Sequence, residues 1–309
     1  MVPGTKSDMI MASVLVERRD SLSGKNIVLI GMPGCGKSTI GVLLAKALCM
    51  DFVDTDLIIQ NKTGKTLQRI IEDDGLAKFL AVENEVLVNL KCDNTVIASG
   101  GSSVLSPAGI LHLREIGTTV YLEISYQTMV GRISNVETRG LVLQTDEKLI
   151  DLYEMRVPLY EKYADIKINC NGFSAQECVG LVQVALNRAS CAEKFFAAKP
   201  DALVLYQKIE NAILNLAKAT VDFQKSQISF GCKRKFAWVW LPVRKVKNRP
   251  DLYVILSLSL ERRLDSRRIV EVIESYPGCW MHHLMISRPD DLDDELLGWI
   301  GEAIDVARS

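Results

Sequence analysis

The feature that most constrains this chain is a glycine-rich octapeptide, GMPGCGKS at residues 31–38, placed between an apolar run and an amphipathic stretch. The run at residues 27–30, Ile-Val-Leu-Ile, is of the kind that is buried on both faces in a parallel sheet. Beyond the octapeptide, apolar residues recur at helical spacing over residues 38–48. The three segments predict a strand, a loop and a helix in direct succession, the unit from which wound α/β sheets are built.

The octapeptide matches the pattern G-x-x-x-x-G-K-[ST], the Walker A motif, whose glycines let the backbone curl so that successive N–H groups face phosphate oxygens. The N-terminus of the following helix adds partial positive charge. We expect Lys37 to reach the β and γ phosphates of a nucleotide and Ser38 to supply a hydroxyl ligand to Mg²⁺. An accidental glycine-rich turn is the alternative, against which the flanking strand and helix argue. The predicted nucleotide-binding residues of the loop are Gly34, Cys35, Gly36, Lys37, Ser38 and Thr39.

Composition and charge exclude several other classes of protein. With 309 residues, 48% of them hydrophobic and 24% charged, the chain has the length of two domains and is not disordered or fibrous. Its 37 Lys and Arg against 38 Asp and Glu create no global field that would attract polyanions or membrane surfaces. Eight cysteines without a CxxC pair predict a reducing cytoplasm, and three histidines without metal-ligand spacing argue against a zinc site.

Neither a membrane span nor a secretory signal is expected. No apolar run approaches the ~20 residues that a membrane-spanning helix needs. Residues 1–24 contain charged side chains and lack a continuous apolar core, which does not fit a secretory signal. We therefore expect residues 1–24 to be an N-terminal extension.

Strand and helix patterns divide the rest of the chain into two expected domains, residues 25–190 and 200–309. In the first, strand candidates alternate with helical stretches, which predicts an α/β fold. Its strands are expected at residues 27–30, 95–98, 119–124 and 166–169, and its helices at 38–48, 67–91, 125–132 and 174–187. In the second, the elements do not alternate strictly, which predicts a smaller α+β domain. It is expected to hold helices at residues 201–223, 266–276 and from 292, and strands at 227–241, 252–260 and 281–287.

A series of short motifs follows the loop along the first expected domain. The motifs are FVDTD at residues 52–56, TGK at 63–65, DG at 74–75, Phe79 with Glu83, GG at 100–101, Arg139, and RVPLY at 156–160. In order and spacing, residues 26–186 resemble the shikimate kinase family, which has the P-loop fold of the nucleoside-monophosphate kinases. The resemblance implies a parallel sheet flanked by helices, ATP and Mg²⁺ as cofactors, and transfer of the γ-phosphoryl group to the 3-hydroxyl of shikimate. In that family the reaction serves aromatic amino-acid biosynthesis, and shikimate is the small-molecule partner.

The resemblance assigns roles to two acids and two glycines. It places Asp54 near the water shell of Mg²⁺ and Asp56 on the acceptor hydroxyls. Asp56 is then the candidate general base, since a carboxylate within reach of a hydroxyl can orient it and take its proton. It places Gly100 and Gly101 beside the substrate, where a backbone without side chains allows close approach. The local alternatives are that the acids only cap the following helix and that the glycines form a plain turn.

The resemblance also assigns roles to three arginines. Arg132 corresponds to the arginine that packs over adenine, and Arg139 to the arginine of a mobile lid that offsets charge on the transferring phosphoryl group. Arg156 corresponds to the arginine that binds the carboxylate of shikimate. For Arg132 and Arg139 the alternative is a solvated surface arginine. Lys37, Asp56 and Arg139 are thus the expected catalytic residues.

Three positions depart from the family's pattern. Gly140 stands in place of a lid proline, Ser102 in place of the third of three glycines, and Leu80 in place of an arginine that helps to hold the substrate carboxylate. In the family that arginine pairs with the acid at the position of Glu83. Without the arginine, we expect Glu83 to repel an anionic acceptor unless Arg156 or another cation neutralises it. Three interpretations stay open: a shikimate kinase with altered carboxylate recognition, a kinase of another polyhydroxylated acceptor such as gluconate, or a nucleotide-binding regulator.

The second expected domain has basic and aromatic residues interleaved between residues 224 and 250, without an acid. Such a stretch fits nucleic acid, but apolar residues alternate with the aromatics, so a buried strand with charged ends is favoured. The acidic run at residues 290–295 is expected to open the last helix and to complement the basic stretch. His282 and His283 fall on opposite faces of a strand, which argues against a chelating pair. We expect a binding or regulatory module that engages a protein partner or dimerises.

Overall fold

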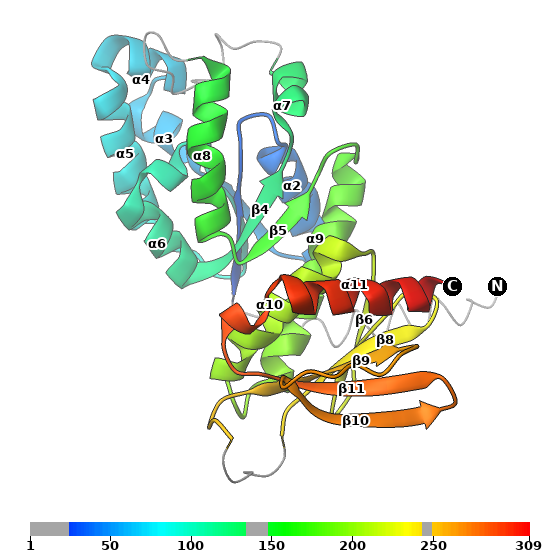
Figure 1. Ribbon diagram of the computed structural model, residues 1–309. Coiled ribbons are helices and arrows are strands. Elements are labelled where there is room, and N and C mark those ends of the chain that lie inside the picture. Colours follow the sequence, from blue (N-terminus) through cyan, green and yellow to red (C-terminus); the bar gives the residue numbers. More distant parts are fainter. Residues whose placement is uncertain (1–24, 134–147, 243–248) are drawn as a thin grey trace, which may run out of the picture. The chain divides into compact units, whose positions relative to one another are not determined.

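The computed structural model describes residues 25–133, 148–242 and 249–309, and the chain divides into two units, Met1–Asn187 and Arg188–Ser309 (Figure 1). Each unit has its own sheet and its own buried apolar cluster, and each is described by itself. In the described ranges, no helix is both long enough and apolar enough to cross a bilayer.

The sheet of the first unit is parallel and has the order β2-β3-β1-β4-β5. Strand β1, Asn26–Ile30, lies at its centre and is buried along its whole length, as expected of a run buried on both faces. The other strands are β2 Asp51–Asp54, β3 Thr95–Ala98, β4 Gly117–Glu123 and β5 Ile166–Asn169. The predicted parallel α/β sheet is confirmed. Its parallel direction brings the carboxyl ends of all these strands to one edge.

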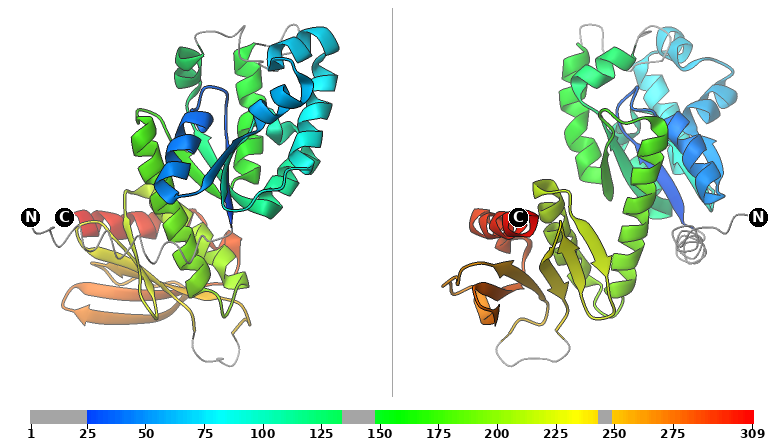
Figure 2. Two further views of the ribbon diagram at one scale, coloured as in Figure 1. Left: turned by 180° about the vertical axis from the view of Figure 1, so that it is seen from behind. Right: turned by 90° about the vertical axis from the view of Figure 1, so that its right-hand side faces the viewer.

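Helices cover both faces of this sheet. They are α2 Lys37–Leu48, α3 Thr55–Thr63, α4 Leu67–Asp74, α5 Leu76–Val88, α6 Pro107–Ile116, α7 Tyr126–Arg132, α8 Leu149–Tyr163 and α9 Ala175–Phe195, with a 3₁₀ turn, η1, at Ser103–Leu105. Helix α8 lies on one side of the sheet and α2 on the other (Figure 2). The helical prediction over residues 67–91 is confirmed as two helices, because Gly75, with a φ of 83°, separates α4 from α5.

A single buried amide aligns the beginnings of three strands. The Asn26 Nδ2 donates to the carbonyls of Cys92, at 2.6 Å, and Ile116, at 2.9 Å. Its Oδ1 accepts from the backbone N–H of Thr95 at 3.0 Å. Both polar atoms of the buried amide are therefore satisfied, and they tie β1 to the segments that lead into β3 and β4.

We predict that Gly41→Ala destabilises the protein. Gly41 lies in α2, and a Cβ there would come within 2.6 Å of the Phe52 ring on β2. Overpacking should lower the free energy of unfolding by about 1 to 3 kcal/mol, although alanine is the better helix former. The matched control is Gly180→Ala in α9, where a Cβ has no neighbour within 4 Å and a gain of up to about 1 kcal/mol is expected. Urea unfolding of the full chain measures both, and equal stability of the two variants would contradict the tight contact.

The second unit is an antiparallel sheet packed against helices. The strand order is β10-β11-β9-β8-β7-β6. The strands are β6 Thr220–Phe223, β7 Ile228–Gly231, β8 Lys235–Trp240, β9 Val254–Leu260, β10 Ile269–Tyr276 and β11 Cys279–Ile286. The helices are α10 Asp201–Leu216 and α11 Asp294–Arg308, with a 3₁₀ turn, η3, at Pro289–Asp291. Helix α11 packs on β8 and β9, and α10 on β9, so the predicted α+β class is confirmed.

Several elements of this unit differ from the prediction. The helix expected at residues 266–276 is wrong, because this segment is strand β10, which pairs with β11 across a turn containing Gly278 at a φ of 77°. The helix expected over residues 201–223 ends at Leu216. The last four residues of the expected range form β6 instead, which pairs with β7. The strand expected over residues 227–241 is a hairpin of β7 and β8. In each case pairing with a neighbouring strand overrides the local pattern.

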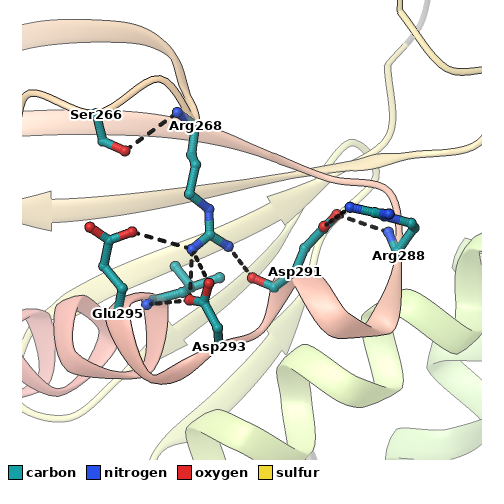
Figure 3. Close-up of polar contacts among 7 residues, drawn as sticks. Ser266, Arg268, Arg288, Asp291, Asp293 and Glu295 are labelled. Atoms are coloured by element: carbon teal, nitrogen blue, oxygen red, sulfur yellow. Dashed lines mark hydrogen bonds and ion pairs between the residues drawn. The ribbon is translucent and has the colours of Figure 1, made fainter.

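The acidic run before α11 pairs with Arg268, at the start of β10 (Figure 3). Arg268 Nη1 donates to both carboxylate oxygens of Asp293, at 2.6 and 2.8 Å, and its Nη2 donates to the carbonyl of Asp291. Asp293 also caps α11, since its side chain accepts from the backbone N–H of Leu296. Within the described residues the run therefore opens the helix, as expected, but its ion pairs are with Arg268 and Arg288 and not with the basic stretch.

Candidate active site

The octapeptide forms a loop between β1 and α2 that requires glycine. Gly34 and Gly36 have φ values of 78° and 98°, a region that residues with a Cβ rarely adopt. The Nζ of Lys37 donates to the carbonyls of Gly31, at 2.7 Å, and Met32, at 3.1 Å. The ammonium group is thus held against the loop, where the backbone conformation is suited to binding an anion.

A cavity of about 630 Å³ at this loop brings most of the predicted site residues together. They come from the loop, from α3, from the segment after β3, and from α7 and α8. The predicted residues that line the cavity are Gly34, Cys35, Gly36, Lys37, Ser38, Thr39, Asp56, Gly101, Arg132 and Arg156. Arg139, the expected lid residue, lies outside the described residues. Asp54 and Gly100 do not line the cavity themselves, but each lies close in sequence to a residue that does, Asp54 two residues before Asp56 and Gly100 directly before Gly101.

The two acids after β2 have different local roles. Asp54 is the N-cap of α3, and its Oδ1 accepts from the backbone N–H of Asp56 at 3.0 Å. Asp56 lines the cavity. Burial, aided by the charge of Asp54 and opposed by Lys37, raises the pKa of Asp56 to about 6. The capping interpretation therefore accounts for Asp54, whereas Asp56 is directed into the cavity with a pKa near neutrality, as a general base requires.

The glycine pair after β3 is packed between two carboxylates and the phosphate loop. A Cβ on Gly100 would lie 2.6 Å from Glu83 Oε1 and 2.8 Å from Asp56 Oδ1. A Cβ on Gly101 would lie 3.0 Å from the Pro33 ring. Because both carboxylates approach the bare backbone so closely, residue 100 has to be glycine, and the segment is more than a plain turn.

Arg156 and Tyr160 of α8 hold the glycine pair from the other side. The Nη1 of Arg156 donates to the carbonyl of Gly101 at 3.1 Å, and the hydroxyl of Tyr160 donates to the same oxygen at 2.6 Å. The Arg156 side chain is almost wholly buried yet borders the cavity. A buried guanidinium at this position is a fixed positive charge in the cavity wall.

Glu83 is the acid that the family resemblance pairs with the arginine replaced here by Leu80. Its side chain is fully buried in α5, and its Oε1 accepts from the Ser102 hydroxyl at 2.7 Å. Among the described residues, its Oε2 has no hydrogen-bond partner. Burial raises the pKa of Glu83 to about 7; the hydrogen bond from Ser102 opposes this rise, the charge of Asp56 adds to it, and Arg156 and Lys37 also oppose it.

Leu80, on the same helix, is not among the residues that line the cavity. It packs against a small apolar cluster formed by Ile59, Ile70, Phe79, Val82 and Val86. Sequence reasoning also missed Phe173 and Cys178, which line the cavity after β5. Their position at the carboxyl edge of a parallel sheet is the signal that could have identified them.

Comparison with known proteins identifies the family to which the first unit is similar. Residues 33–186 match the family model for shikimate kinase, and residues 192–307 match one described as a domain of unknown function (DUF5655). A shikimate kinase of Clostridium botulinum is 39% identical over 158 residues, which cover 51% of this chain and 94% of that protein. The chain belongs to the shikimate kinase family. A shikimate kinase of Microcystis aeruginosa is 40% identical over 152 residues, 48% of this chain and 79% of the relative.

A solved structure supports the same assignment. The shikimate kinase from Acinetobacter baumannii in complex with shikimate aligns with a TM-score of 0.51 and 31% identity, covering 55% of this chain and 98% of that one. This member of the shikimate kinase family is a phosphotransferase with a hydroxyl group as acceptor, and the family implies ATP as its co-substrate.

We predict that Glu83→Gln stabilises this kinase increasingly as the pH rises. The native pKa of Glu83, about 7, lies above the ordinary value of 4.5, so the native state binds more protons between these pH values. The stability of the wild-type enzyme therefore falls as the pH rises through this window, and the amide removes that loss. The gain should grow by on the order of 1 to 3 kcal/mol between pH 5 and 8, measured by urea unfolding. The surface variant Glu154→Gln is the control, and a gain independent of pH would contradict the buried carboxylate.

Proposed function

We propose that this kinase transfers the γ-phosphoryl group of ATP to the 3-hydroxyl of shikimate. The observation that carries the proposal is that one cavity is lined by the phosphate loop, with Lys37 and Ser38, and by Asp56, a carboxylate with a pKa near neutrality. The likeness to a kinase solved in complex with shikimate supports the choice of acceptor. Phosphoryl transfer needs both reactants fixed in line, and a shared cavity supplies that positioning.

The nucleotide end of the cavity is the β1–α2 loop. The backbone N–H groups of residues 34–39 and the Lys37 ammonium would bind the terminal phosphates, and Arg132 would pack over adenine. Ser38 and Asp54 are the residues proposed to hold Mg²⁺. In nucleotide sites Mg²⁺ takes most of its ligands from phosphates and water, so few protein ligands are needed. When bound, Mg²⁺ neutralises charge on the phosphate oxygens.

The acceptor end is built from Asp56, the glycine pair and Arg156. Asp56 would orient the attacking hydroxyl and take its proton onto a carboxylate oxygen as the oxygen–phosphorus bond forms. Arg156 would bind the acceptor carboxylate, with its guanidinium held in place by the Gly101 carbonyl. Gly100 and Gly101 would let the sugar-like ring approach the backbone. Arg139 stays the proposed lid residue that offsets charge on the transferring group.

We predict that Asp56→Asn lowers kcat with shikimate by about 10²- to 10⁴-fold, the usual contribution of a general base, while ATP affinity is retained. The measurement is ADP release coupled to a reporter reaction, with shikimate and gluconate as separate acceptors. Asp51→Asn, at the exposed start of β2, the strand that precedes α3, is the control for loss of one acid. Wild-type turnover by Asp56→Asn would remove Asp56 from the chemistry. Stimulation by gluconate and not shikimate would overturn the proposed acceptor.

We predict that Leu80→Arg restores part of the acceptor binding that the family obtains from an arginine at this position. A hydrogen bond to a charged group is worth ~1.5 to 3 kcal/mol, so KM for shikimate should fall about tenfold to a hundredfold while KM for ATP stays constant. Leu80→Met, which keeps the apolar packing, is the control. An unchanged KM for shikimate in Leu80→Arg would show that the carboxylate is bound elsewhere.

For residues 200–309 we propose a binding or regulatory module that engages a protein partner or a second copy of the chain. Its two adjacent histidines have separate structural partners. The Nε2 of His282 accepts from the backbone N–H of Leu264 at 2.9 Å, and the Nδ1 of His283 lies 2.7 Å from the Ser257 hydroxyl. Each histidine therefore has its own polar partner, one on β9 and one in the segment that follows β9.

A further inference from the structure

Ser102 and Glu83 form a buried hydrogen-bonded couple at the acceptor end of the cavity. Ser102 is 4% exposed and lines the cavity, and its hydroxyl donates to Glu83 Oε1 at 2.7 Å. The same Oε1 is the atom that a Cβ on Gly100 would contact at 2.6 Å. The carboxylate therefore lies against the backbone of the glycine pair, and Ser102 holds it there.

Leu80 and Ser102, two positions at which this sequence departs from the family's pattern, compensate for each other at Glu83. With leucine at residue 80, packed in the apolar cluster, no guanidinium from that position can reach Glu83. The buried carboxylate then needs another donor, because an unsatisfied charged group in a protein interior is costly. Ser102 supplies that donor to one oxygen, while the other oxygen, Oε2, has no hydrogen-bond partner among residues 25–133, 148–242 and 249–309.

Charged residues on three other helices act on Glu83. Asp56 of α3 adds a negative charge, and Lys37 of α2 and Arg156 of α8 add positive charges. The Tyr160 hydroxyl of α8 also has an electrostatic interaction with Glu83. A negative Glu83 in this setting opposes the entry of an anionic acceptor, and a protonated Glu83 does not.

We propose that Ser102 is a specificity-determining positioning residue that anchors Glu83 in place of the missing arginine and so makes the binding of an anionic acceptor depend on the charge of Glu83. The proposal rests on the proposed function, since it takes a carboxylate-bearing alcohol as the acceptor. It goes beyond that function because it assigns to this chain a control of acceptor affinity built from its own residues.

The charge dependence gives a specific signature. The serine hydroxyl donates to the carboxylate and stabilises the ionised form, so it lowers the pKa of Glu83 from the value that burial alone would impose. The apparent affinity for an anionic acceptor should therefore fall as the pH rises through a midpoint set by Glu83. Removal of the hydroxyl should move that midpoint upward.

The experiment is a pH series of kcat/KM for shikimate, from pH 5.5 to 9, on the full-length enzyme at saturating ATP. For the wild type we expect a fall of about tenfold across the alkaline limb, with a midpoint near pH 7. In Ser102→Ala the midpoint should rise by about one pH unit. In Ser102→Thr, which keeps a hydroxyl, it should stay in place. Glu83→Gln keeps a hydrogen-bond acceptor for the serine but carries no charge, so the fall of kcat/KM at alkaline pH should vanish.

Matched controls separate this role from a general effect on folding. Ser103→Ala removes the neighbouring buried hydroxyl, which contacts Ser99 and not Glu83, and should keep the wild-type midpoint. KM for ATP should be unchanged in all variants. Two results would overturn the role of the Ser102–Glu83 couple while leaving the proposed function intact. One is an unchanged pH midpoint of kcat/KM in Ser102→Ala, and the other is a fall of kcat/KM at alkaline pH that persists in Glu83→Gln. A wild-type enzyme that releases no ADP with shikimate at any pH would overturn the proposed function as well.

Discussion

The pairing of β1 with β3 is the constraint on which the active site depends. Leu29 lies opposite Ala98, and its carbonyl accepts from both the backbone N–H of Ser99, at 3.2 Å, and the Ser99 hydroxyl, at 3.0 Å. The phosphate loop and the glycine pair therefore leave the sheet next to each other. Because β2 pairs with the other side of β3, with Asp54 opposite Ala98, helix α3 begins at the same edge. This register is what carries Asp56 to the cavity.

The site concentrates charge that a purely structural region would avoid. Asp56 and Glu83 both approach Gly100, and Lys37 and Arg156 act as the opposing cations. Buried carboxylates with a raised pKa are unfavourable for stability, because as the pH rises the folded protein must ionise groups that are shielded from water. A cavity that keeps them has a chemical use for them, which is consistent with a kinase that must orient and deprotonate a hydroxyl.

The second unit shows where local patterns mislead. In residues 269–276 the apolar side chains fit a helical period about as well as an alternating one, and the segment becomes a strand only because β11 pairs along it. The same holds for β6, which continues a helical pattern in the sequence but pairs with β7. By contrast, the apolar run at residues 27–30 of β1 and the octapeptide after it have one physically reasonable structure, and both are found as predicted.

The sequence by itself determined the phosphate loop, because a short motif with fixed backbone requirements carries that information locally. It also determined the α/β class, through alternating strand and helix patterns, and the family of the first unit, through a series of motifs after the loop. Only the tertiary structure decided that Asp54 caps a helix while Asp56 enters the cavity, and that Ser102 donates to Glu83 where an arginine is absent. Glu83 and Ser102 are 19 positions apart and lie on different elements. Their distances, burial and charges exist only once strand register and helix packing have brought them to one edge of the sheet.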